Sequence, residues 1–243
     1  MEKQYPENTL ISFKNAFESG AYGVECDLQK SADGKFVIIH DDSLDRVSLN
    51  KAGMISEMTL QELKKSDLGN DQTVSEISEL LEIIPDGRGL NLEIKEETIK
   101  PEDCQEIYSI LTGYLKKEQI FVSSFNPLLL PFFKKMGIRT GLLIGKHKNF
   151  FKIINDVIKS RAVCLNLPVQ MFDVIGKFWS SVFINAMKLA GKQIVFYTVN
   201  TRQEFEQCIK YSQIFITDRV ADVKDYLCSV DMDVRRDQKI ENI

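Results

Sequence analysis

The sequence contains no apolar run long enough to cross a membrane, because a transmembrane helix needs about 20 consecutive apolar residues. It has no basic run and a formal net charge of -4, so nothing in its composition predicts a nucleic-acid surface. The five cysteines are odd in number and lack paired spacing, which favours reduced thiols over a disulfide framework or a zinc site. No apolar segment of the secretory type follows the first residues, and we expect a cytoplasmic protein without a transmembrane segment.

Helical patterns and short apolar strands alternate along most of the 243 residues. Such alternation is typical of repeated βαβ units that build a parallel sheet. The strands are expected in a hairpin over residues 23–42 and then at Leu90–Lys95, Gln119–Ser124, Thr140–Ile144, Ala162–Leu167, Gln193–Thr198 and Ile214–Asp218. With one arm of the hairpin counted, these are seven parallel strands, whereas a closed (β/α)₈ barrel has eight. We therefore predict an α/β fold, a TIM-type (β/α)₈ barrel with its first strand missing.

No linker divides the chain, so we predict one barrel domain over residues 1–229 with a small insertion at about 47–72. The segment at 230–243 carries mixed charge and is expected to be a solvated tail. Among the expected helices, Asn8–Gly20 precedes the first strand, and a short helix begins after the capping residue Thr59.

The hairpin over residues 23–42 contains the first candidate site. An Asp33-Gly34 pair between apolar runs predicts a two-residue turn, which would place Asp27 opposite His40. Side-chain alternation sends Glu25 and Asp27 to one face of the first strand. Two carboxylates beside a histidine indicate a hard-metal site with a proton-transfer group. A solvated acidic face with a histidine there by chance is the alternative.

The strand Leu90–Lys95 contributes a second polar face. Alternation puts Glu93 and Lys95 on the same side, near the carboxyl end of the strand, where barrel enzymes form their sites. In isolation these two residues predict an ion pair. Beside the hairpin, they predict a third metal ligand and an anion-binding lysine.

Several segments, in one order and with matching spacing, resemble the motifs of the glycerophosphodiester phosphodiesterase family. They are Pro6-Glu-Asn-Thr9, Glu25-Cys-Asp27, His40-Asp-Asp42 with Leu44-Asp-Arg46, Leu92-Glu-Ile-Lys95, Val122-Ser-Ser-Phe-Asn126, Tyr197-Thr-Val-Asn200 and Ile216-Thr-Asp218. The resemblance covers nearly the whole chain. It implies a metal-dependent hydrolase of lipid metabolism that converts a small-molecule glycerophosphodiester into glycerol 3-phosphate and an alcohol.

The resemblance also implies a role for each candidate residue. A divalent metal ion, Mg²⁺ or Ca²⁺, would be bound by three carboxylates, and His40 would act as the general acid or base. Substrate would be contacted by Lys95, Phe125 and Tyr197, with tyrosine standing where many relatives carry tryptophan. The metal ligands implied in this way are Glu25, Asp27 and Glu93.

The sequence departs from the family pattern in one respect. The family places a strand ending in His-Arg-Gly shortly before the segment that resembles Pro6-Glu-Asn-Thr9, and this sequence does not contain it. We therefore expect the chain as written to bind a metal ion yet to hydrolyse its substrate poorly. His147, in a basic loop, is not expected to replace the family's other histidine. The alternatives are a non-catalytic binding protein of the same fold and a related phospholipase.

Overall fold

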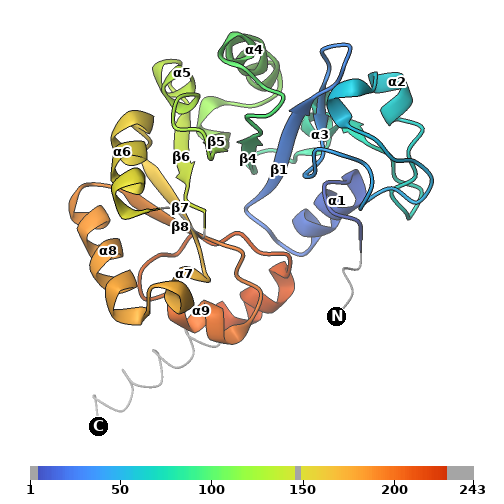
Figure 1. Cartoon of the computed structure of the whole chain (residues 1–243). Helices are drawn as coiled ribbons and strands as arrows, with labels where there is room; N and C mark the ends of the chain where they lie inside the picture. The colour runs from blue at the N-terminus through green and yellow to red at the C-terminus, as the bar shows by residue number, and fades with distance from the viewer. Residues whose placement is uncertain (1–4, 146–148, 229–243) are drawn as a thin grey trace. The chain divides into compact units, whose positions relative to one another are not determined.

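The computed structural model describes residues 5–145 and 149–228 (Figure 1). The chain divides into two compact units, Met1–Asn166 and Leu167–Ile243. Each unit is described by itself below. The segment predicted to be a charged tail, 230–243, lies outside the described residues. Within the described part of the chain, no helix is both long enough and apolar enough to cross a membrane.

The first unit is built on a sheet in which the strands lie in the order β3-β2-β1-β4-β5-β6-β7. The strands are β1 (Gly23–Lys30), β2 (Phe36–Ile38), β3 (Ser75–Glu76), β4 (Gly89–Ile94), β5 (Ile120–Ser124), β6 (Arg139–Leu143) and β7 (Cys164–Pro168). Neighbours from β1 to β7 run parallel, whereas β2 pairs antiparallel with both β1 and β3. The predicted strands of this unit are confirmed, with ends that differ by one or two residues, except that the hairpin predicted to residue 42 ends its second strand at Ile38.

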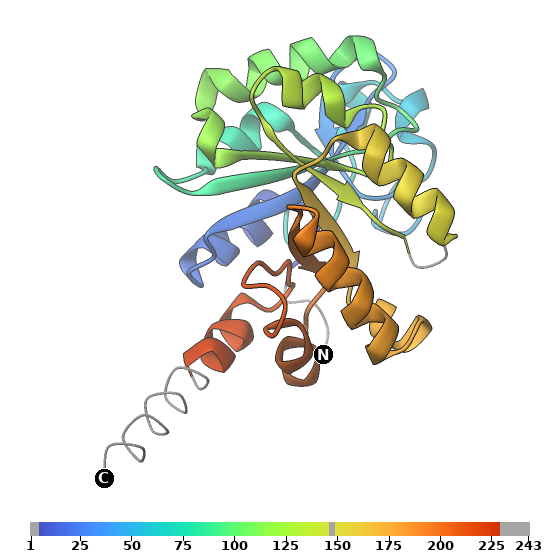
Figure 2. The same ribbon diagram turned by 90° about the vertical axis from the view of Figure 1, so that its left-hand side faces the viewer.

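Helices follow the strands of the first unit as the alternating pattern predicts. They are α1 (Leu10–Glu18), α2 (Leu60–Leu63), α3 (Ile77–Ile83), α4 (Cys104–Tyr114), α5 (Leu130–Lys135) and α6 (Phe150–Ser160). In Figures 1 and 2 the green helices α4 and α5 lie along one side of the strands β4, β5 and β6. The opposite side of these strands is therefore left for the polar side chains described below.

Local signals in the sequence explain where the short helices begin. Thr59 accepts a hydrogen bond from the backbone of Glu62, and the Glu62 carboxylate accepts one from the backbone of Thr59. This capping box satisfies two amide groups that a helix start otherwise leaves unpaired. Asn149 caps α6 in a similar way through the backbone of Phe151. The predicted helix after Thr59 is confirmed.

The segment predicted as an insertion packs on the outer end of the hairpin. Three of its apolar residues form a small buried cluster with two residues of the hairpin and with two residues that flank the segment. The cluster consists of Val37, Ile39, Leu44, Ile55, Leu63, Leu68 and Val74. This packing fixes the chain just before and just after His40, which follows Ile39 directly.

The predicted register of the hairpin is wrong by one residue. The loop has three residues, because Ser31 and Lys35 are joined by a backbone hydrogen bond of 2.9 Å and Gly34 adopts a φ of 79°. A type I turn followed by a left-handed glycine is the usual form of a three-residue hairpin loop, and Asp-Gly fits it as well as it fits a two-residue turn. Leu28 therefore pairs with Ile38.

The shift changes the predicted neighbours of the site residues. The carbonyl of Asp27 accepts a 2.9 Å hydrogen bond from the backbone of Ile39, so Ile39 takes the place expected for His40. Because β2 ends at Ile38, His40 lies beyond the strand and is free of the strict side-chain alternation.

The second unit contains the end of β7 and the elements that follow it. These are α7 (Met171–Val174), α8 (Lys177–Leu189), β8 (Gln193–Tyr197), α9 (Arg202–Cys208) and a helical segment at 220–228. α7 and α8 are separate helices, because Gly176 between them adopts a φ of 79°. The expected strand at 214–218 is reduced to one parallel bridge between Phe196 and Phe215.

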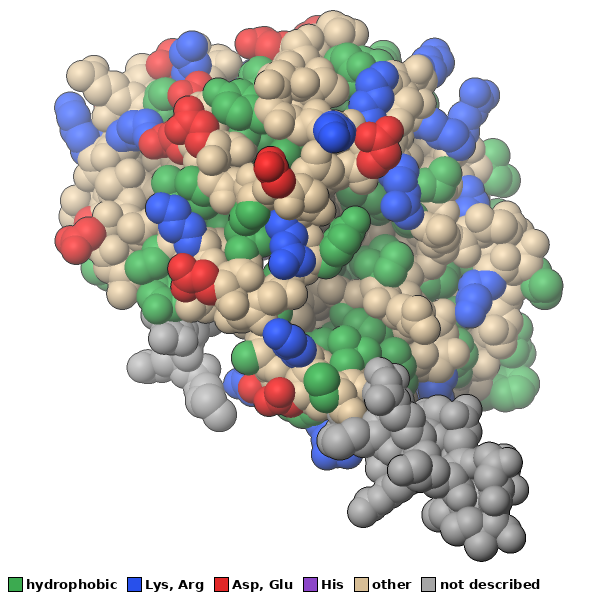
Figure 3. Space-filling model, turned by 180° about the vertical axis from the view of Figure 1, so that it is seen from behind, with side chains coloured by type: hydrophobic (Ala, Val, Ile, Leu, Met, Phe, Trp, Pro, Cys, Tyr) green, Lys and Arg blue, Asp and Glu red, His purple; other side chains and the backbone are tan. Residues whose placement is uncertain are grey.

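On the face drawn in Figure 3, acidic and basic side chains are interspersed with hydrophobic ones. This agrees with the nearly balanced totals of 31 basic and 35 acidic residues in the sequence. The prediction that the protein does not bind nucleic acid stays a prediction.

Candidate active site

Two neighbouring parallel strands bring three carboxylates together. Asp27 on β1 and Glu93 on β4 are register partners, and Glu25 lies two residues before Asp27 on the same face. Ligand atoms of the three residues all lie within 4.8 Å of one another. Cys26, between the two acidic residues of β1, points to the opposite face and is fully buried. The predicted convergence of the three carboxylates is confirmed.

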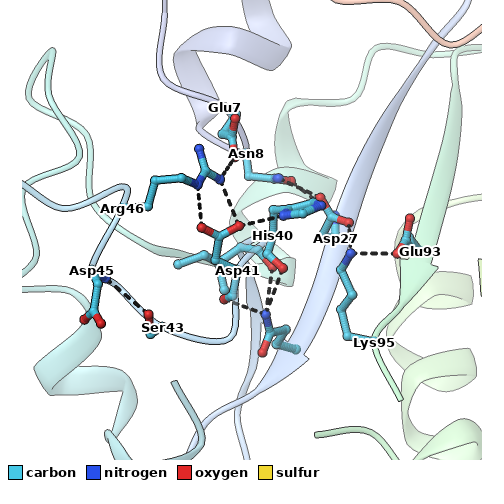
Figure 4. Close-up of polar contacts among 12 residues, drawn as sticks. Glu7, Asn8, Asp27, His40, Asp41, Ser43, Asp45, Arg46, Glu93 and Lys95 are labelled. Atoms are coloured by element: carbon cyan, nitrogen blue, oxygen red, sulfur yellow. Dashed lines mark hydrogen bonds and ion pairs between the residues drawn. The ribbon is translucent and has the colours of Figure 1, made fainter. Parts of the chain in front are cut away.

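Lys95 lies between two of these carboxylates (Figure 4). Its ammonium group is 2.8 Å from Oδ1 of Asp27 and 2.6 Å from Oε1 of Glu93. Burial alone would lower the pKa of Lys95, but the two carboxylates raise it above its ordinary value. Burial and the nearby Asp27 raise the pKa of Glu93, and Lys95 opposes that rise. The lysine therefore stays protonated and partly neutralises the carboxylate cluster.

Asn8 fixes the orientation of Asp27 through two hydrogen bonds. Its side-chain amide donates to Oδ2 of Asp27 at 2.8 Å, and its side-chain carbonyl accepts from the backbone of Asp27 at 3.1 Å. Asn8 adopts a φ of 55°, a left-handed conformation that asparagine tolerates better than most residues. The sequence motif contains Asn8, but its contact with Asp27 could not be read from the motif.

His40 lies at the same cavity as Glu93 and Lys95, although not by the predicted pairing. The cavity has a volume of about 440 Å³ and is lined by His40, Glu93 and Lys95, together with Phe125. The His40 side chain is 55% exposed, so its ring is accessible to a molecule in the cavity. The remaining lining residues are Asp41, Asp42, Ile94, Glu96, Glu97 and Ser124.

A chain of ionic contacts holds the His40 ring on the side away from the carboxylate cluster of Glu25, Asp27 and Glu93 (Figure 4). Nδ1 of His40 is 2.7 Å from Oδ1 of Asp41. Arg46 donates to both carboxylate oxygens of Asp41, at 2.5 Å and 2.9 Å, and also to Glu7. The hydrogen bonds from Arg46 lower the pKa of Asp41 to about 2. Asp41 is therefore anionic and binds Nδ1, which leaves Nε2 of His40 for a substrate.

The depressed pKa of Asp41 predicts a pH-dependent contribution to stability. An aspartate in an unfolded chain has a pKa of about 3.9, so Asp41 stabilises the fold above that pH. This stabilisation is lost as the pH falls from about 4 to about 2, where the folded group also takes up a proton. Because the site is partly exposed, screening limits the effect to about 1 kcal/mol. Urea denaturation of Asp41→Asn should show this loss of unfolding free energy at pH 6 and almost none at pH 2.

Asp42→Asn is the matched control for this prediction. Asp42 also lines the cavity, but its carboxylate forms no ion pair with the part of the chain that the structure describes. Its replacement should change the free energy of unfolding much less at pH 6. An equal loss in both variants would show that Arg46 gives Asp41 no special stability.

Of the two aromatic residues predicted to contact substrate, Phe125 lies at the cavity and Tyr197 lies in the second unit. Phe125 follows β5 and lines the cavity beside Ser124. Tyr197 is the last residue of β8, in the second unit, and its role in substrate binding stays a prediction. The prediction that His147 does not replace a catalytic histidine concerns a residue outside the described ranges.

The carboxylate cluster fits a divalent metal ion by its chemistry. Carboxylate oxygens are the preferred ligands of Mg²⁺ and Ca²⁺, and three of them on two adjacent strands can share one ion. A second group, Glu7, His40 and Asp41, also brings ligand atoms within 4.8 Å of one another. The first cluster offers three carboxylates and the second only two with a histidine, so the first is better suited to an ion that prefers oxygen ligands.

Comparison with known proteins shows which family the sequence resembles. A sequence model of the glycerophosphoryl diester phosphodiesterase family matches residues 1–222. A glycerophosphodiester phosphodiesterase from Caldanaerobacter subterraneus subsp. tengcongensis is 36% identical over 221 residues, which cover 86% of each chain. One from Bacillus altitudinis is 31% identical over 84% of this chain and 85% of its own.

Solved structures of phosphodiesterases are also similar to this chain. The structure of an Oleispira antarctica phosphodiesterase in complex with the product sn-glycerol-3-phosphate has a TM-score of 0.79, with 26% identity over 92% of both chains. The glycerophosphodiester phosphodiesterase from Thermotoga maritima has a TM-score of 0.73, with 28% identity over 90% of this chain and 91% of that chain.

The parallel sheet, its alternating helices and these neighbours define an α/β barrel hydrolase of the TIM type. More narrowly, the chain belongs to the glycerophosphoryl diester phosphodiesterase family and is a hydrolase of glycerophosphodiesters. The family and the reaction class predicted from the motifs are confirmed.

Proposed function

We propose that the cavity lined by His40, Glu93 and Lys95 is the active site, in which a glycerophosphodiester is hydrolysed to glycerol 3-phosphate and an alcohol. The observation that carries this proposal is that Glu93, a member of the cluster of three carboxylates, lines one cavity together with Lys95 and an accessible His40. A volume of about 440 Å³ suits a small-molecule substrate. Glycerol 3-phosphate in the Oleispira relative supports the assignment of the product.

In this proposal Glu25, Asp27 and Glu93 hold a divalent ion, Mg²⁺ or Ca²⁺. When bound, such an ion polarises phosphoryl oxygens and offsets the negative charge of the substrate. Asn8 keeps one oxygen of Asp27 directed by its 2.8 Å hydrogen bond, which is how neighbouring groups usually orient metal ligands. The buried strand positions of Asp27 and Glu93 keep the cluster rigid before substrate arrives.

Lys95 is assigned to the substrate phosphate. Three carboxylates and a divalent ion leave a net charge of about minus one, and a phosphodiester brings another negative charge. The ammonium of Lys95 lies among these carboxylates at 2.6–2.8 Å, so it can offset part of that charge. If the Lys95 side chain turns toward the phosphate, it loses its contacts with Asp27 and Glu93. A metal ion bound by these carboxylates would then supply the positive charge that Lys95 provided.

His40 is assigned to proton transfer. Its Nε2 can take the proton of the attacking hydroxyl or water, or give a proton to the alkoxide oxygen that leaves phosphorus. Asp41, bonded to Nδ1 at 2.7 Å, stabilises the charged ring and fixes its orientation. Phe125 supplies an apolar surface at the cavity, where it can contact the carbon skeleton of the substrate.

Metal removal tests the proposal. Incubation with a chelator should lower the release of glycerol 3-phosphate from a glycerophosphodiester by at least about 100-fold, because charge neutralisation by a metal typically contributes several kcal/mol. Adding Mg²⁺ or Ca²⁺ back should restore the rate. A coupled assay for glycerol 3-phosphate measures both steps.

Two results would contradict the proposal. Turnover that survives complete metal removal would exclude the metal role of the carboxylate cluster. Binding of the metal ion and of glycerol 3-phosphate by calorimetry, with no release from any diester, would favour the alternative of a non-catalytic binding protein.

A further inference from the structure

Gln29 makes an unusual set of contacts behind His40. Its side-chain amide nitrogen lies 3.3 Å, 3.2 Å and 2.7 Å from three consecutive backbone oxygens, those of Ile39, His40 and Asp41. Gln29 is completely buried and sits on β1, two residues after Asp27 and on the same face. No other donor within residues 5–145 and 149–228 is found on these three oxygens.

The three contacts settle how the amide is oriented. Backbone oxygens only accept hydrogen bonds, so the NH₂ end of Gln29 must face them and its oxygen must face away. That oxygen is buried and has no partner among the described residues, a cost that the contacts of the nitrogen offset. An amide nitrogen has two hydrogens, so the short bond to Asp41 takes one and the other is shared between Ile39 and His40.

The contacts explain how the chain leaves β2. In an extended strand successive carbonyls point to opposite sides, whereas here three in a row converge on one nitrogen. Ile39 makes the last ladder bond, from its backbone nitrogen to Asp27, and the carbonyl of Asp42 accepts the next backbone bond, from Ile55. Between these two fixed points, the Gln29 amide contacts the backbone oxygens of all three residues that lead the chain past His40.

We propose that Gln29 is a positioning residue that sets the place of His40 relative to the carboxylate cluster. The inference rests on the proposed function, because it assigns Gln29 a role through the proton-transfer group. Gln29 does not line the cavity, so it acts without touching substrate. Asp27 and Gln29 lie on the same strand, β1. This strand therefore fixes the distance between the carboxylate cluster, which contains Asp27, and His40, which Gln29 positions.

The test compares Gln29→Met with wild type in the full chain. Methionine has a similar length and no donor, so the three carbonyls lose their common partner and the His40 segment relaxes. Displacement of a catalytic group by about 1 Å can lower the rate by about 100-fold, so kcat for glycerol 3-phosphate release should fall by about 10–100-fold. KM and the affinity for Mg²⁺ should change by less than about threefold. Gln29→Asn, which keeps an amide that is too short to reach, should give a similar result.

Gln119→Met is the matched control. Gln119 also donates its side-chain amide to a backbone oxygen, that of Arg88, at 2.7 Å, but at the other end of the strands. Its replacement should lower the urea midpoint without changing kcat. If Gln29→Met and Gln119→Met lower stability alike and both keep wild-type kcat, the positioning role is excluded.

A double-mutant cycle separates this role from a general effect on the fold. In a His40→Ala background, Gln29→Met should cause no further loss of kcat, because both changes remove the same contribution. A further loss of 10-fold or more would overturn the inference. If His40→Ala itself has no effect, the proposed function fails, and that outcome is distinct from failure of Gln29.

Nuclear magnetic resonance gives a readout that does not need turnover. The sequence has two histidines, so the imidazole signals of His40 can be assigned with a His147 variant. Gln29→Met should shift or broaden the His40 signals, and Gln119→Met should leave them unchanged. Unchanged His40 signals in folded Gln29→Met would overturn the inference.

Discussion

Replacement of His40 by alanine should lower kcat for glycerol 3-phosphate release by about 10³-fold, within the range expected for loss of a positioned acid or base. His40 is the single histidine among the cavity-lining residues, and its Nδ1 is held by Asp41 at 2.7 Å. The ring does not belong to the carboxylate cluster, so the affinity for the divalent ion should stay within about threefold of wild type. Steady-state kinetics and metal titration by calorimetry measure the two quantities.

The second histidine of the chain provides the control. His147→Ala should keep kcat close to wild type, because the family resemblance assigns no role to that position. His40→Gln, which keeps a polar side chain but cannot exchange a proton near neutral pH, should be nearly as slow as His40→Ala. Wild-type turnover in either His40 variant would remove His40 from the mechanism.

The carboxylate cluster could be predicted because it depends on a short and regular pattern. Glu25 and Asp27 are two residues apart on a strand, and so are Glu93 and Lys95, so alternation fixes their faces whatever surrounds them. Parallel neighbours in a barrel then bring the two faces together. A shift of the sheet by two residues would still have left all of them on the same side.

The hairpin shows where such reasoning fails. Asp33-Gly34 is compatible with loops of two and of three residues, and the two choices differ by one position in the pairing. His40 nevertheless lines the cavity because the backbone turns after Ile38, and that turn depends on Gln29, eleven positions away. The outcome for His40 was therefore set by a long-range hydrogen bond that no local pattern encodes.

Similar contacts explain which residues the sequence did not assign. Asn8, Arg46 and Glu7 lie within segments that resemble family motifs, but their partners are 5 to 39 positions away in the chain. A sequence motif identifies such residues as a group, but it does not show which of their atoms form hydrogen bonds with one another. In the second unit, the strand predicted at 214–218 is reduced to a single parallel bridge between Phe196 and Phe215.

Replacement of Lys95 by methionine should make the stability of the protein depend on a divalent cation. Lys95 is 12% exposed and contacts Asp27 and Glu93, so its loss leaves these two carboxylates without their shared positive partner. Removing one member of a buried ion pair costs about 3–5 kcal/mol, which corresponds to a fall in Tm of about 6–20 °C for a chain of this size. Addition of Mg²⁺ or Ca²⁺ should recover most of that loss, because the ion supplies the missing charge and binds the folded state. Activity should stay low even with the ion, because the substrate phosphate has lost its cation.

Lys30→Met separates this effect from the general loss of a lysine. Lys30 pairs with both oxygens of Asp103 at 2.8 Å, and neither residue lines the cavity. Its replacement should also lower Tm, but the addition of a divalent ion should raise Tm no more than it does in wild type. Thermal denaturation of the three proteins with a chelator and with excess Mg²⁺ gives the comparison. If the ion stabilises Lys95→Met no more than Lys30→Met, the cluster of Glu25, Asp27 and Glu93 is not the metal site. Wild-type turnover in Lys95→Met would show that binding of the substrate phosphate does not depend on this lysine.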